Sequence, residues 1–482
     1  MTRSILPPEK FIFGSAVLCF VFLYFLFYPS IYAFRDEASY LSMAYALRTG
    51  NFFLDKTLGP LQSWMTYRGH KVFDYPLGMP FFLLPFITFG WRAIFMAGLL
   101  SHLAGSLYFK KLLTLFKIDH PVLPLLYLFY PGFVFYSRTI MSDVPAAALF
   151  ITGVYYYFQS GSPDWKAGTF FASSFLFRPS ALVFIFPFAI GGLWRNFSTG
   201  KVRSSLFFLF PLGFSLFLIG LYQYFFYGSP WLSAYSQKFL KIPNFSIRYY
   251  PENLRHYFIA LMTSYPLMVM APFAASKTRR PEILVSLLAG VLFFGAYYFH
   301  DRFETGFQTS VLGARFLFPA AALFLLIYAE ALDNLLKRLR GFAARAFSWL
   351  LSFLLLLSAL FVHSRHQQVL KNQATMKETI YSSTPEGSAL IYDGNAAELL
   401  QEVWGGRKYI YWRDGENDLR DYLHHADFKK GIYLIHRNDQ PGNFSLSWVP
   451  SEGMAQIKKE FDVRQIAKYG ELEIYQFYER PH

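Results

Sequence analysis

Two adjacent carboxylates follow the first apolar run of the chain. This run extends from Phe11 to Ile31 without a charged residue, and the sequence IYAFRDEASY then places Asp36 and Glu37 directly after it. A charge in the hydrocarbon core of a bilayer costs roughly 2.5 kcal/mol or more, so we expect these acids at or beyond the membrane interface. A carboxylate there can accept a proton as a general base, or it can cap the helix that follows. Both interpretations of Asp36 are open at this point.

Further polar residues stand beside other apolar runs. Asp143 lies in YSRTIMSDVPAAA and Arg315 lies in GARFLFP, each where an apolar run begins. The segment HKVFDYPLGMP, residues 70–80, leads into an apolar stretch at 81–90 that is too short to span a bilayer. Each feature has an ordinary structural explanation: a helix cap for Asp143, an interface anchor for Arg315 and a turn for Pro-Leu-Gly. Together they predict an outward-facing cleft that contains carboxylates and basic groups.

Eleven apolar segments have the composition of membrane-spanning helices. They are residues 11–33, 93–109, 121–136, 144–159, 166–178, 180–194, 204–227, 256–275, 283–300, 312–334 and 346–362. The short pair 166–178 and 180–194 is interrupted by FRPS, so it forms either two broken helices or a re-entrant hairpin. A short helix from Asp36, with both acids in its first turn and Gly50 as its stop, is expected in the outer interface. We predict an all-α polytopic membrane domain over residues 1–362, with interfacial helices within 34–90.

Composition supports this class. Of the 482 residues 54% are hydrophobic and 16% are charged, whereas soluble domains carry about 25% charged residues. The net charge of +14 does not indicate nucleic-acid binding, because the basic residues form short clusters between apolar runs. The single cysteine, Cys19, excludes intrachain disulfides and cysteine-based metal sites. The first apolar run is too long for the core of a cleavable signal peptide and is interpreted as a transmembrane helix.

The distribution of basic residues predicts the orientation, because cytoplasmic loops are enriched in Lys and Arg. With the N-terminus inside, the short outer connections hold only Arg138, Arg178 and Arg302. The inner loops hold Arg3, Lys10, Lys110, Lys111, Lys117, Lys166, Arg195, Lys201, Arg203, Lys277, Arg279, Arg280, Lys337, Arg338, Arg340 and Arg345. The long segments 34–80 and 228–255 and everything after Val362 then lie outside. Function is therefore expected on the outer face.

After Val362 the composition becomes that of a soluble domain. Strands are expected at 388–392, 408–412 and 431–435, alternating with helices at 395–403 and 415–426. A further helix near 452–461 and strands near 462–467 and 471–478 complete the segment. We therefore predict a small extracytoplasmic α/β domain over residues 363–482. It shows no glycine-rich phosphate loop and no metal-ligand spacing, so we interpret it as an accessory or acceptor-facing domain.

The first outer loop resembles that of the membrane-embedded glycosyltransferases with the GT-C fold, the superfamily of protein O-mannosyltransferases and the lipid A aminoarabinose transferase. That loop opens with Asp-Glu, a tyrosine and an alanine-rich helix ending near Thr-Gly, here Asp36, Glu37, Tyr40 and Thr49-Gly50. The other matches are Tyr75-Pro76-Leu77-Gly78 for the Tyr-Pro-Pro-Gly or Lys-Pro-Pro-Leu motif, and Ser137-Arg138 with Asp143-x-Pro145. The resemblance covers residues 11 to about 195, and Arg315 matches loosely. Asp74 stands where the aminoarabinose transferases have a phosphate-binding lysine, so Lys71, His70 or Arg68 is expected to supply that charge.

The resemblance implies a glycosyltransferase in the bacterial inner membrane that moves a sugar from a polyprenyl-phosphate donor to a lipid, glycan or protein acceptor. Asp36 is the expected general base, with Glu37 as the alternative and Asp143 as a further catalytic residue. Basic groups would face the lipid phosphate that leaves, so a divalent cation is compatible but not demanded. The expected substrate-binding residues are Tyr40, Arg68, His70, Lys71, Asp74, Tyr75, Arg138 and Arg315.

Two other classes of protein share some of these features. A polytopic transporter or lipid-linked glycan flippase also uses buried charges, but such proteins usually show internal repeats and polar residues near mid-membrane. This chain shows no internal repeat, and its charges gather at one face. A receptor or scaffold for the outer domain would leave the clustered acids unexplained. No nucleic-acid motif is present.

Overall fold

The chain forms two compact units, Met1–Tyr28 with Pro76–His366, and Pro29–Tyr75 with Gln367–His482. The structure is a computed structural model. It describes residues 9–32, 34–52, 64–67, 70–73, 75–160, 163–232, 245–266, 268, 271–274, 276–278, 280–297, 315–339, 341–392, 396, 399–400, 407–411, 422–437 and 457–480. The predicted boundary between residues 362 and 363 stays a prediction.

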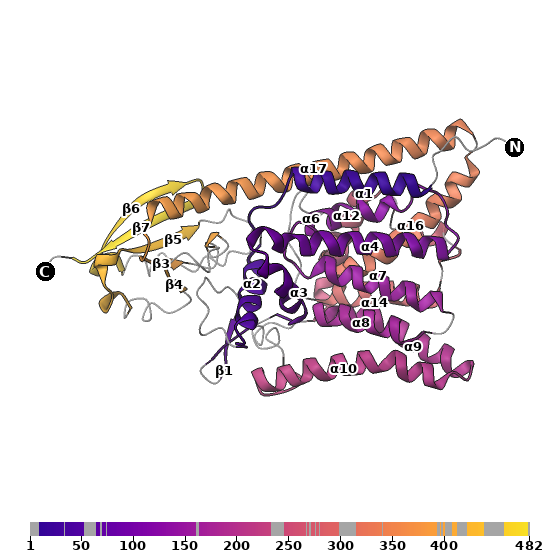
Figure 1. The fold of residues 1–482 in the computed structure, drawn as a ribbon, viewed down its shortest axis with the longest axis horizontal. Helices are drawn as coiled ribbons and strands as arrows, with labels where there is room; N and C mark the ends of the chain where they lie inside the picture. Colours follow the sequence, from indigo (N-terminus) through magenta and orange to yellow (C-terminus); the bar gives the residue numbers. More distant parts are fainter. Residues whose placement is uncertain are drawn as a thin grey trace. The chain divides into compact units, whose positions relative to one another are not determined.

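The first unit is built from helices. Figure 1 shows α4, α7, α8 and α10 side by side as successive helices, and α7 packs against both α4 and α8. Short 3-10 turns, η1 (Trp91–Phe95), η2 (Pro179–Ala181), η3 (Ile247–Tyr249) and η5 (Arg315–Leu317), precede four of the helices. Within the described residues, the helices are α1 (Glu9–Leu26), α3 (Gly78–Thr88), α4 (Met96–Leu115), α5 (Leu125–Leu128), α6 (Pro131–Tyr136), α7 (Asp143–Gln159), α8 (Trp165–Phe177), α9 (Leu182–Ser198), α10 (Val202–Tyr227), α12 (Tyr250–Ser264), α13 (Ala271–Ala274), α14 (Pro281–Ala296), α16 (Phe318–Arg338) and the first part of α17 (Phe342–Ser383).

Five helical segments within the described ranges are long and apolar enough to cross a membrane. They are Trp91–Leu115, Pro179–Ser198, Val202–Tyr227, Arg315–Arg338 and Phe342–Ser383. In Arg315–Arg338, 83% of the most apolar 18-residue window is buried, so this helix lies in the core of the unit. In Val202–Tyr227 the buried share of that window is only 22%, and the helix exposes a largely apolar surface. Phe11–Leu26, Gly78–Thr88 and Pro281–Ala296 are shorter apolar helices. The mostly helical membrane architecture is thus confirmed, and the count of eleven spans stays a prediction.

Prolines divide two segments that the sequence presents as apolar. Residues 121–136 form the two short helices α5 and α6, because Pro131 opens α6 and the residue before it, Tyr130, is extended. Residues 166–194 form the separate helices α8 and α9. Arg178 lies extended between them, at φ −148° and ψ 99°, and Pro179 begins the turn η2. The break at Arg178 is thus confirmed, and whether the pair crosses the membrane or forms a re-entrant hairpin stays a prediction.

The second unit contains α2 (Arg35–Arg48), a hairpin and a five-stranded sheet. The hairpin pairs β1 (Trp64–Tyr67) with β2 (His70–Phe73). The sheet has the order β4-β3-β5-β7-β6, in which β3 is parallel to β4 and β5, while β7 is antiparallel to β5 and β6. Its strands are β3 (Ala389–Tyr392), β4 (Lys408–Tyr411), β5 (Ile432–Arg437), β6 (Asp462–Tyr469) and β7 (Leu472–Tyr478). The predicted strands are confirmed within a few residues, and the predicted helices 395–403 and 415–426 lie mostly outside the described residues.

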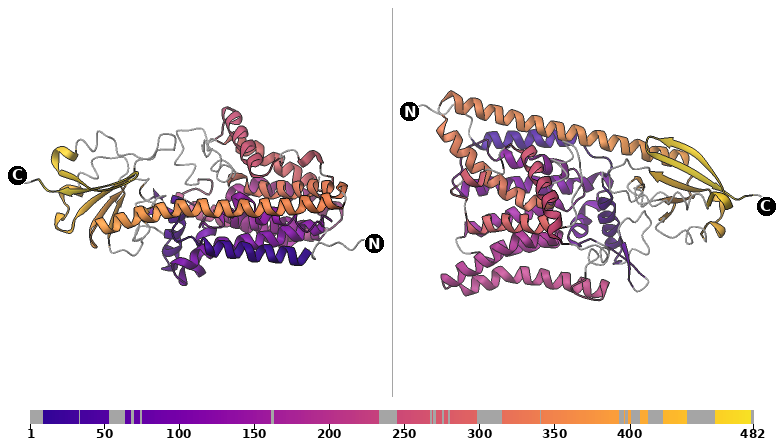
Figure 2. Two further views of the ribbon diagram at one scale, coloured as in Figure 1. Left: turned by 90° about the horizontal axis from the view of Figure 1, so that it is seen from above. Right: turned by 180° about the vertical axis from the view of Figure 1, so that it is seen from behind.

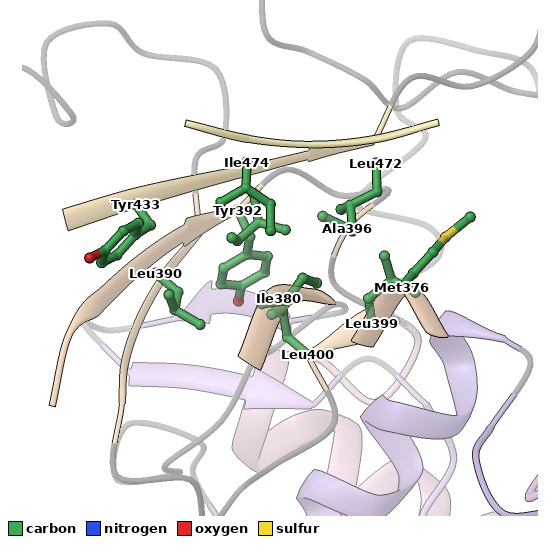
Figure 3. Close-up of a cluster of buried hydrophobic side chains, with 11 residues drawn as sticks. Met376, Ile380, Leu390, Tyr392, Ala396, Leu399, Leu400, Tyr433, Leu472 and Ile474 are labelled. Atoms are coloured by element: carbon green, nitrogen blue, oxygen red, sulfur yellow. The ribbon is translucent and has the colours of Figure 1, made fainter. Parts of the chain in front are cut away.

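Alternating side chains of β3 supply two apolar cores, one on each face of the sheet. Ala389 and Ile391 face a core that includes Leu434 and Phe461. On the other face, Leu390 and Tyr392 pack with Met376, Ile380, Leu399, Leu400 and Ile474, as Figure 3 shows. Met376 and Ile380 belong to α17, so the end of this helix covers the second face.

Helix α17 extends well beyond the predicted span 346–362. Figures 1 and 2 show it as one continuous helix, from Phe342 to Ser383. The sequence 342–383 contains neither glycine nor proline, so nothing in it interrupts helical hydrogen bonding where the composition becomes polar. Pro385 and Gly387 follow its end. The helix therefore continues past Val362, where the composition changes.

A buried carboxylate organises one end of the helical unit. Glu330 of α16 is 0% exposed and accepts hydrogen bonds from the backbone N–H groups of Ser276, Lys277 and Thr278 at 2.6–2.7 Å. The hydroxyls of Ser276 and Thr278 also donate to it, at 3.1 and 2.6 Å. Both carboxylate oxygens therefore serve as acceptors for the segment 276–278.

We expect Glu330→Gln to destabilise the protein by about 1.5–3 kcal/mol, because the amide turns a donor towards buried N–H groups that need an acceptor. The measurement is the melting temperature of the purified protein. Asp333→Asn is the matched control, because Asp333 is also buried but pairs with Lys337, whose side chain is 57% exposed. Water can solvate that ammonium when the carboxylate is removed, so stability should change less. Equal losses in the two variants would contradict a special role for Glu330.

Candidate functional site

The two adjacent acids of α2 have different surroundings. Glu37 is 0% exposed, and its Oε1 accepts a hydrogen bond from the backbone N–H of Phe34 at 2.9 Å. Glu37 therefore satisfies a donor at the start of the helix, as in a capping box. Asp36 is half-buried, and its Oδ1 accepts a hydrogen bond from the hydroxyl of Tyr75 at 2.8 Å. The capping interpretation thus applies to Glu37, while Asp36 is oriented by a residue far along the chain.

Aromatic contacts hold Tyr75 in place. Its ring lies 5.0 Å from that of Tyr40 and 5.6 Å from that of Phe73, and Tyr40 and Phe73 are 6.1 Å apart. Tyr40 lies one turn after Asp36 on α2, and Phe73 ends β2. The predicted site residues Asp36, Tyr40 and Tyr75 are therefore brought together within the second unit. A carboxylate oriented by a tyrosine hydroxyl is suited to accept a proton from a bound hydroxyl group.

A second cluster lies in the first unit, at the start of α7. Ser142 is the N-cap of this helix, so Asp143 is its first residue and not its cap. Asp143 is 1% exposed and forms an ion pair with Arg178, which stands at the break between α8 and α9. Among the described residues, its Oδ2 is buried without a hydrogen-bond partner. The pair shows why a charge is tolerated within the apolar segment 166–194.

Arg315 joins this cluster through Phe316. The guanidinium carbons of Arg178 and Arg315 lie 5.0 and 4.9 Å from the centroid of the Phe316 ring. Both guanidinium groups also act electrostatically on the hydroxyl of Tyr297, whose ring lies 6.3 Å from that of Phe316. Among the described residues, two arginines and one carboxylate meet here. Guanidinium groups bind phosphate and carboxylate oxygens through paired hydrogen bonds.

Close packing explains why the motif Tyr75-Pro76-Leu77-Gly78 ends in glycine. A Cβ atom on Gly78 would lie 2.6 Å from the carbonyl oxygen of Leu176 and 2.8 Å from the backbone nitrogen of Phe177. The start of α3 therefore touches the backbone at the end of α8, directly before Arg178. This close approach explains the residue type at position 78.

Arg138 lies inside the first unit, at 1% exposure, in the turn between α6 and α7. Its Nε donates a hydrogen bond to Nδ1 of His366 on α17 at 2.9 Å. Nδ1 is the acceptor, so this imidazole is neutral and carries its proton on Nε2. The same turn packs against Gly98 of α4, where a Cβ would lie 2.3 Å from the carbonyl oxygen of Ser137. The hydrogen bond from Arg138 thus connects the turn before Asp143 to α17. The predicted contact of Arg138 with substrate stays a prediction.

We expect His366→Leu to destabilise the protein by about 1.5–3 kcal/mol, because it removes the acceptor of a charged buried donor. His366→Asn should lose less, since the asparagine oxygen lies close to the position of Nδ1. The measurement is the free energy of unfolding, with His363→Leu as control, because Nδ1 of His363 bonds the carbonyl of Ala359 in its own helix. A loss in the asparagine variant equal to that in His366→Leu would contradict the assignment.

The remaining predicted residues lie around β2. Arg68 and Asp74 fall outside the described residues. His70 and Lys71 belong to β2, where they pair in register with Tyr67 and Thr66, and the structure does not describe their side chains. Within the described ranges, no group of three His, Cys, Asp or Glu side chains is arranged to hold a metal ion.

Arg178 and His366 were not among the predicted site residues. The sequence did carry a signal for Arg178, namely a charge and a proline in the middle of an apolar segment. His366 has no such signal, because a histidine in a helix is ordinary and its partner lies 228 positions away.

Comparison with solved structures gives the fold. No protein-family model and no curated protein matches the sequence. The crystal structure of ArnT from Cupriavidus metallidurans bound to undecaprenyl phosphate matches with a TM-score of 0.57 and 11% identity, over 97% of this chain and 98% of that chain. The same protein in the apo state matches with a TM-score of 0.55 and 10% identity, over 97% of each chain. The chain therefore has the GT-C fold, as the sequence resemblance predicted.

Proposed function

We propose that this protein is an integral membrane glycosyltransferase that moves a sugar from a polyprenyl-phosphate donor to a lipid, glycan or protein acceptor. The observation that carries the proposal is the likeness to ArnT over nearly the whole length of both chains, in a structure that contains undecaprenyl phosphate. The oriented carboxylate of Asp36 and the arginine-rich cluster at Asp143 supply two kinds of group that such a transfer requires. The reaction takes place on the outer face of the membrane. The basic residues of the inner loops predict that residues 34–80 lie on that face.

In this mechanism Asp36 is the general base. A hydroxyl of the acceptor loses its proton to the carboxylate while its oxygen forms a bond to the anomeric carbon of the sugar. The bond between that carbon and the phosphate oxygen breaks, and its electron pair leaves with the polyprenyl phosphate. The hydrogen bond from Tyr75 fixes the orientation of Asp36, which keeps the proton-accepting group in position without neutralising it.

Arginine side chains stabilise the leaving phosphate. Negative charge accumulates on this group as the sugar departs, and fixed cations favour that state over the ground state. Arg178 and Arg315 are assigned to this role, with Lys71, His70 and Arg68 as further candidates from the sequence. Asp143 holds Arg178 in position through their ion pair. No metal ion is needed for this step, although a divalent cation is compatible with it.

The test compares cells with and without the gene. Mass spectrometry of glycolipids and glycoproteins should show one sugar modification in the wild type that is missing in the deletion strain, and Asp36→Asn should fail to restore it. Purified protein should also be stabilised against heat by undecaprenyl phosphate, since that ligand binds the folded state. A deletion strain that loses the modification and accumulates the lipid-linked sugar on the cytoplasmic side would favour a flippase instead, because loss of a transferase leaves the donor on the outer face.

A further inference from the structure

Three helices bring aromatic rings together near the end of α7 that is far from Asp143. Tyr108 of α4 lies 5.8 Å from Tyr156 of α7 and 6.3 Å from Phe170 of α8, measured between ring centroids. Tyr156 and Phe170 are stacked, 5.4 Å apart with an interplanar angle of 5°. The hydroxyls of Tyr108 and Tyr156 are hydrogen-bonded at 3.2 Å. All three side chains are half-buried, so one edge of this cluster is accessible.

Two exposed lysines flank the tyrosine pair. The ammonium of Lys111 lies 4.5 Å from the centroid of Tyr108, and that of Lys166 lies 5.7 Å from the centroid of Tyr156. Both act electrostatically on the hydroxyl of Tyr156. Within the described part of the chain, neither lysine forms an ion pair with a carboxylate. The nearby Asp164 accepts hydrogen bonds from backbone N–H groups at the start of α8. The cluster therefore presents two positive charges and two hydroxyls at one place.

An apolar stripe on α4 leads to this cluster. Leu100, Ala104, Leu107 and Lys111 are exposed and follow one another at helical spacing, so they share one face of the helix. The two leucines are 49% and 44% exposed. The eleven residue steps from Leu100 to Lys111 advance the helix by about 16 Å, which is close to half of the roughly 30 Å hydrocarbon core of a bilayer. The stripe thus has about the length of one leaflet's acyl chains, with Lys111 at one of its ends.

We propose that Tyr108, Tyr156, Phe170, Lys111 and Lys166 bind the headgroup of an anionic phospholipid whose acyl chains lie along the stripe of α4. The ammonium groups pair with the phosphate, and the tyrosine hydroxyl that accepts the hydrogen bond within the pair donates its own proton to a phosphate oxygen. The stripe favours a lipid over a soluble phosphate, because a soluble anion gains nothing from Leu100 and Leu107. The site belongs to the opposite end of α7 from Asp143, so it is separate from the cluster assigned to the sugar donor.

The experiment measures lipid binding to the purified full-length protein by native mass spectrometry. Dioleoyl phosphatidylglycerol is titrated against wild type, the double variant Lys111→Gln/Lys166→Gln and the control Lys110→Gln/Lys117→Gln. The control removes the same charge from the same end of α4, and Lys110 lies over Phe13 of α1 rather than over the tyrosines. We expect the affinity to fall at least tenfold in Lys111→Gln/Lys166→Gln and to stay within about twofold in the control. Tyr156→Phe should show a smaller loss than the double lysine variant.

Three results would overturn this site. Equal losses in the two double variants would show that binding depends on net charge alone. Equal retention of dioleoyl phosphatidylcholine would show that the anionic headgroup is not recognised. Displacement of the lipid by millimolar inorganic phosphate would show that the site takes a soluble anion. Because the readout is lipid binding, the result does not depend on whether the protein transfers a sugar.

Discussion

Asp36→Asn is expected to lower the rate of sugar transfer by about 10²–10⁴-fold while the melting temperature stays close to that of wild type. Asparagine has nearly the same shape as aspartate, and its oxygen can still accept the hydrogen bond from Tyr75, which measures 2.8 Å in the wild type. It cannot accept a proton from the acceptor hydroxyl. The fold should tolerate the change, because Glu37 rather than Asp36 accepts the Phe34 N–H at the start of α2.

The neighbouring acid provides the matched control. Glu37→Gln keeps an oxygen for the N–H of Phe34, so both rate and stability should remain near wild type if its role is structural. Glu37→Ala should lose stability of about 0.5–2 kcal/mol, as for other helix caps. Transfer rates and melting temperatures of Asp36→Asn, Asp36→Ala, Glu37→Gln and Glu37→Ala separate these roles. A near wild-type rate in Asp36→Asn, together with a large loss in Glu37→Gln, would move the general base to Glu37.

Local signals in the sequence were sufficient for the elements around the site. The helix after Asp36 follows from its acidic first turn and from Gly50, and α2 indeed extends from Arg35 to Arg48. The alternating apolar strands near the C-terminus were also predictable, because a period of two is a local property. Apolar composition was a weaker guide to helix boundaries. It presents residues 121–136 as one span, although Pro131 divides them.

Pairing between distant residues was not predictable from the sequence. Asp36 and Tyr75 were both candidates, but they are 39 positions apart and only the packing of Tyr40 and Phe73 turns the tyrosine towards the acid. Asp143 and Arg178 are 35 positions apart, and their meeting depends on the break between α8 and α9. A sequence shows which side chains carry charge. The partner of each charge is set by backbone geometry over tens of residues.

The Asp143–Arg178 pair leads to the second large expected effect. Arg178→Gln should destabilise the protein by about 3 kcal/mol, because it leaves the buried carboxylate of Asp143 without its cation. It should also weaken binding of undecaprenyl phosphate, if Arg178 faces the phosphate of the donor. Arg315→Gln should weaken the same binding by about 1.5–3 kcal/mol, because a charge-assisted contact with the phosphate is lost.

The double variant Asp143→Asn/Arg178→Gln separates the two consequences. It removes both charges of the ion pair, so most of the stability lost in Arg178→Gln should return, whereas binding of undecaprenyl phosphate should stay weak. Unfolding free energies and lipid affinities of wild type, Asp143→Asn, Arg178→Gln and the double variant form a complete thermodynamic cycle. Recovery of both stability and affinity in the double variant would mean that Arg178 only neutralises Asp143. If Arg315→Gln also kept wild-type affinity, the phosphate contact would have to be sought among Arg68, His70 and Lys71.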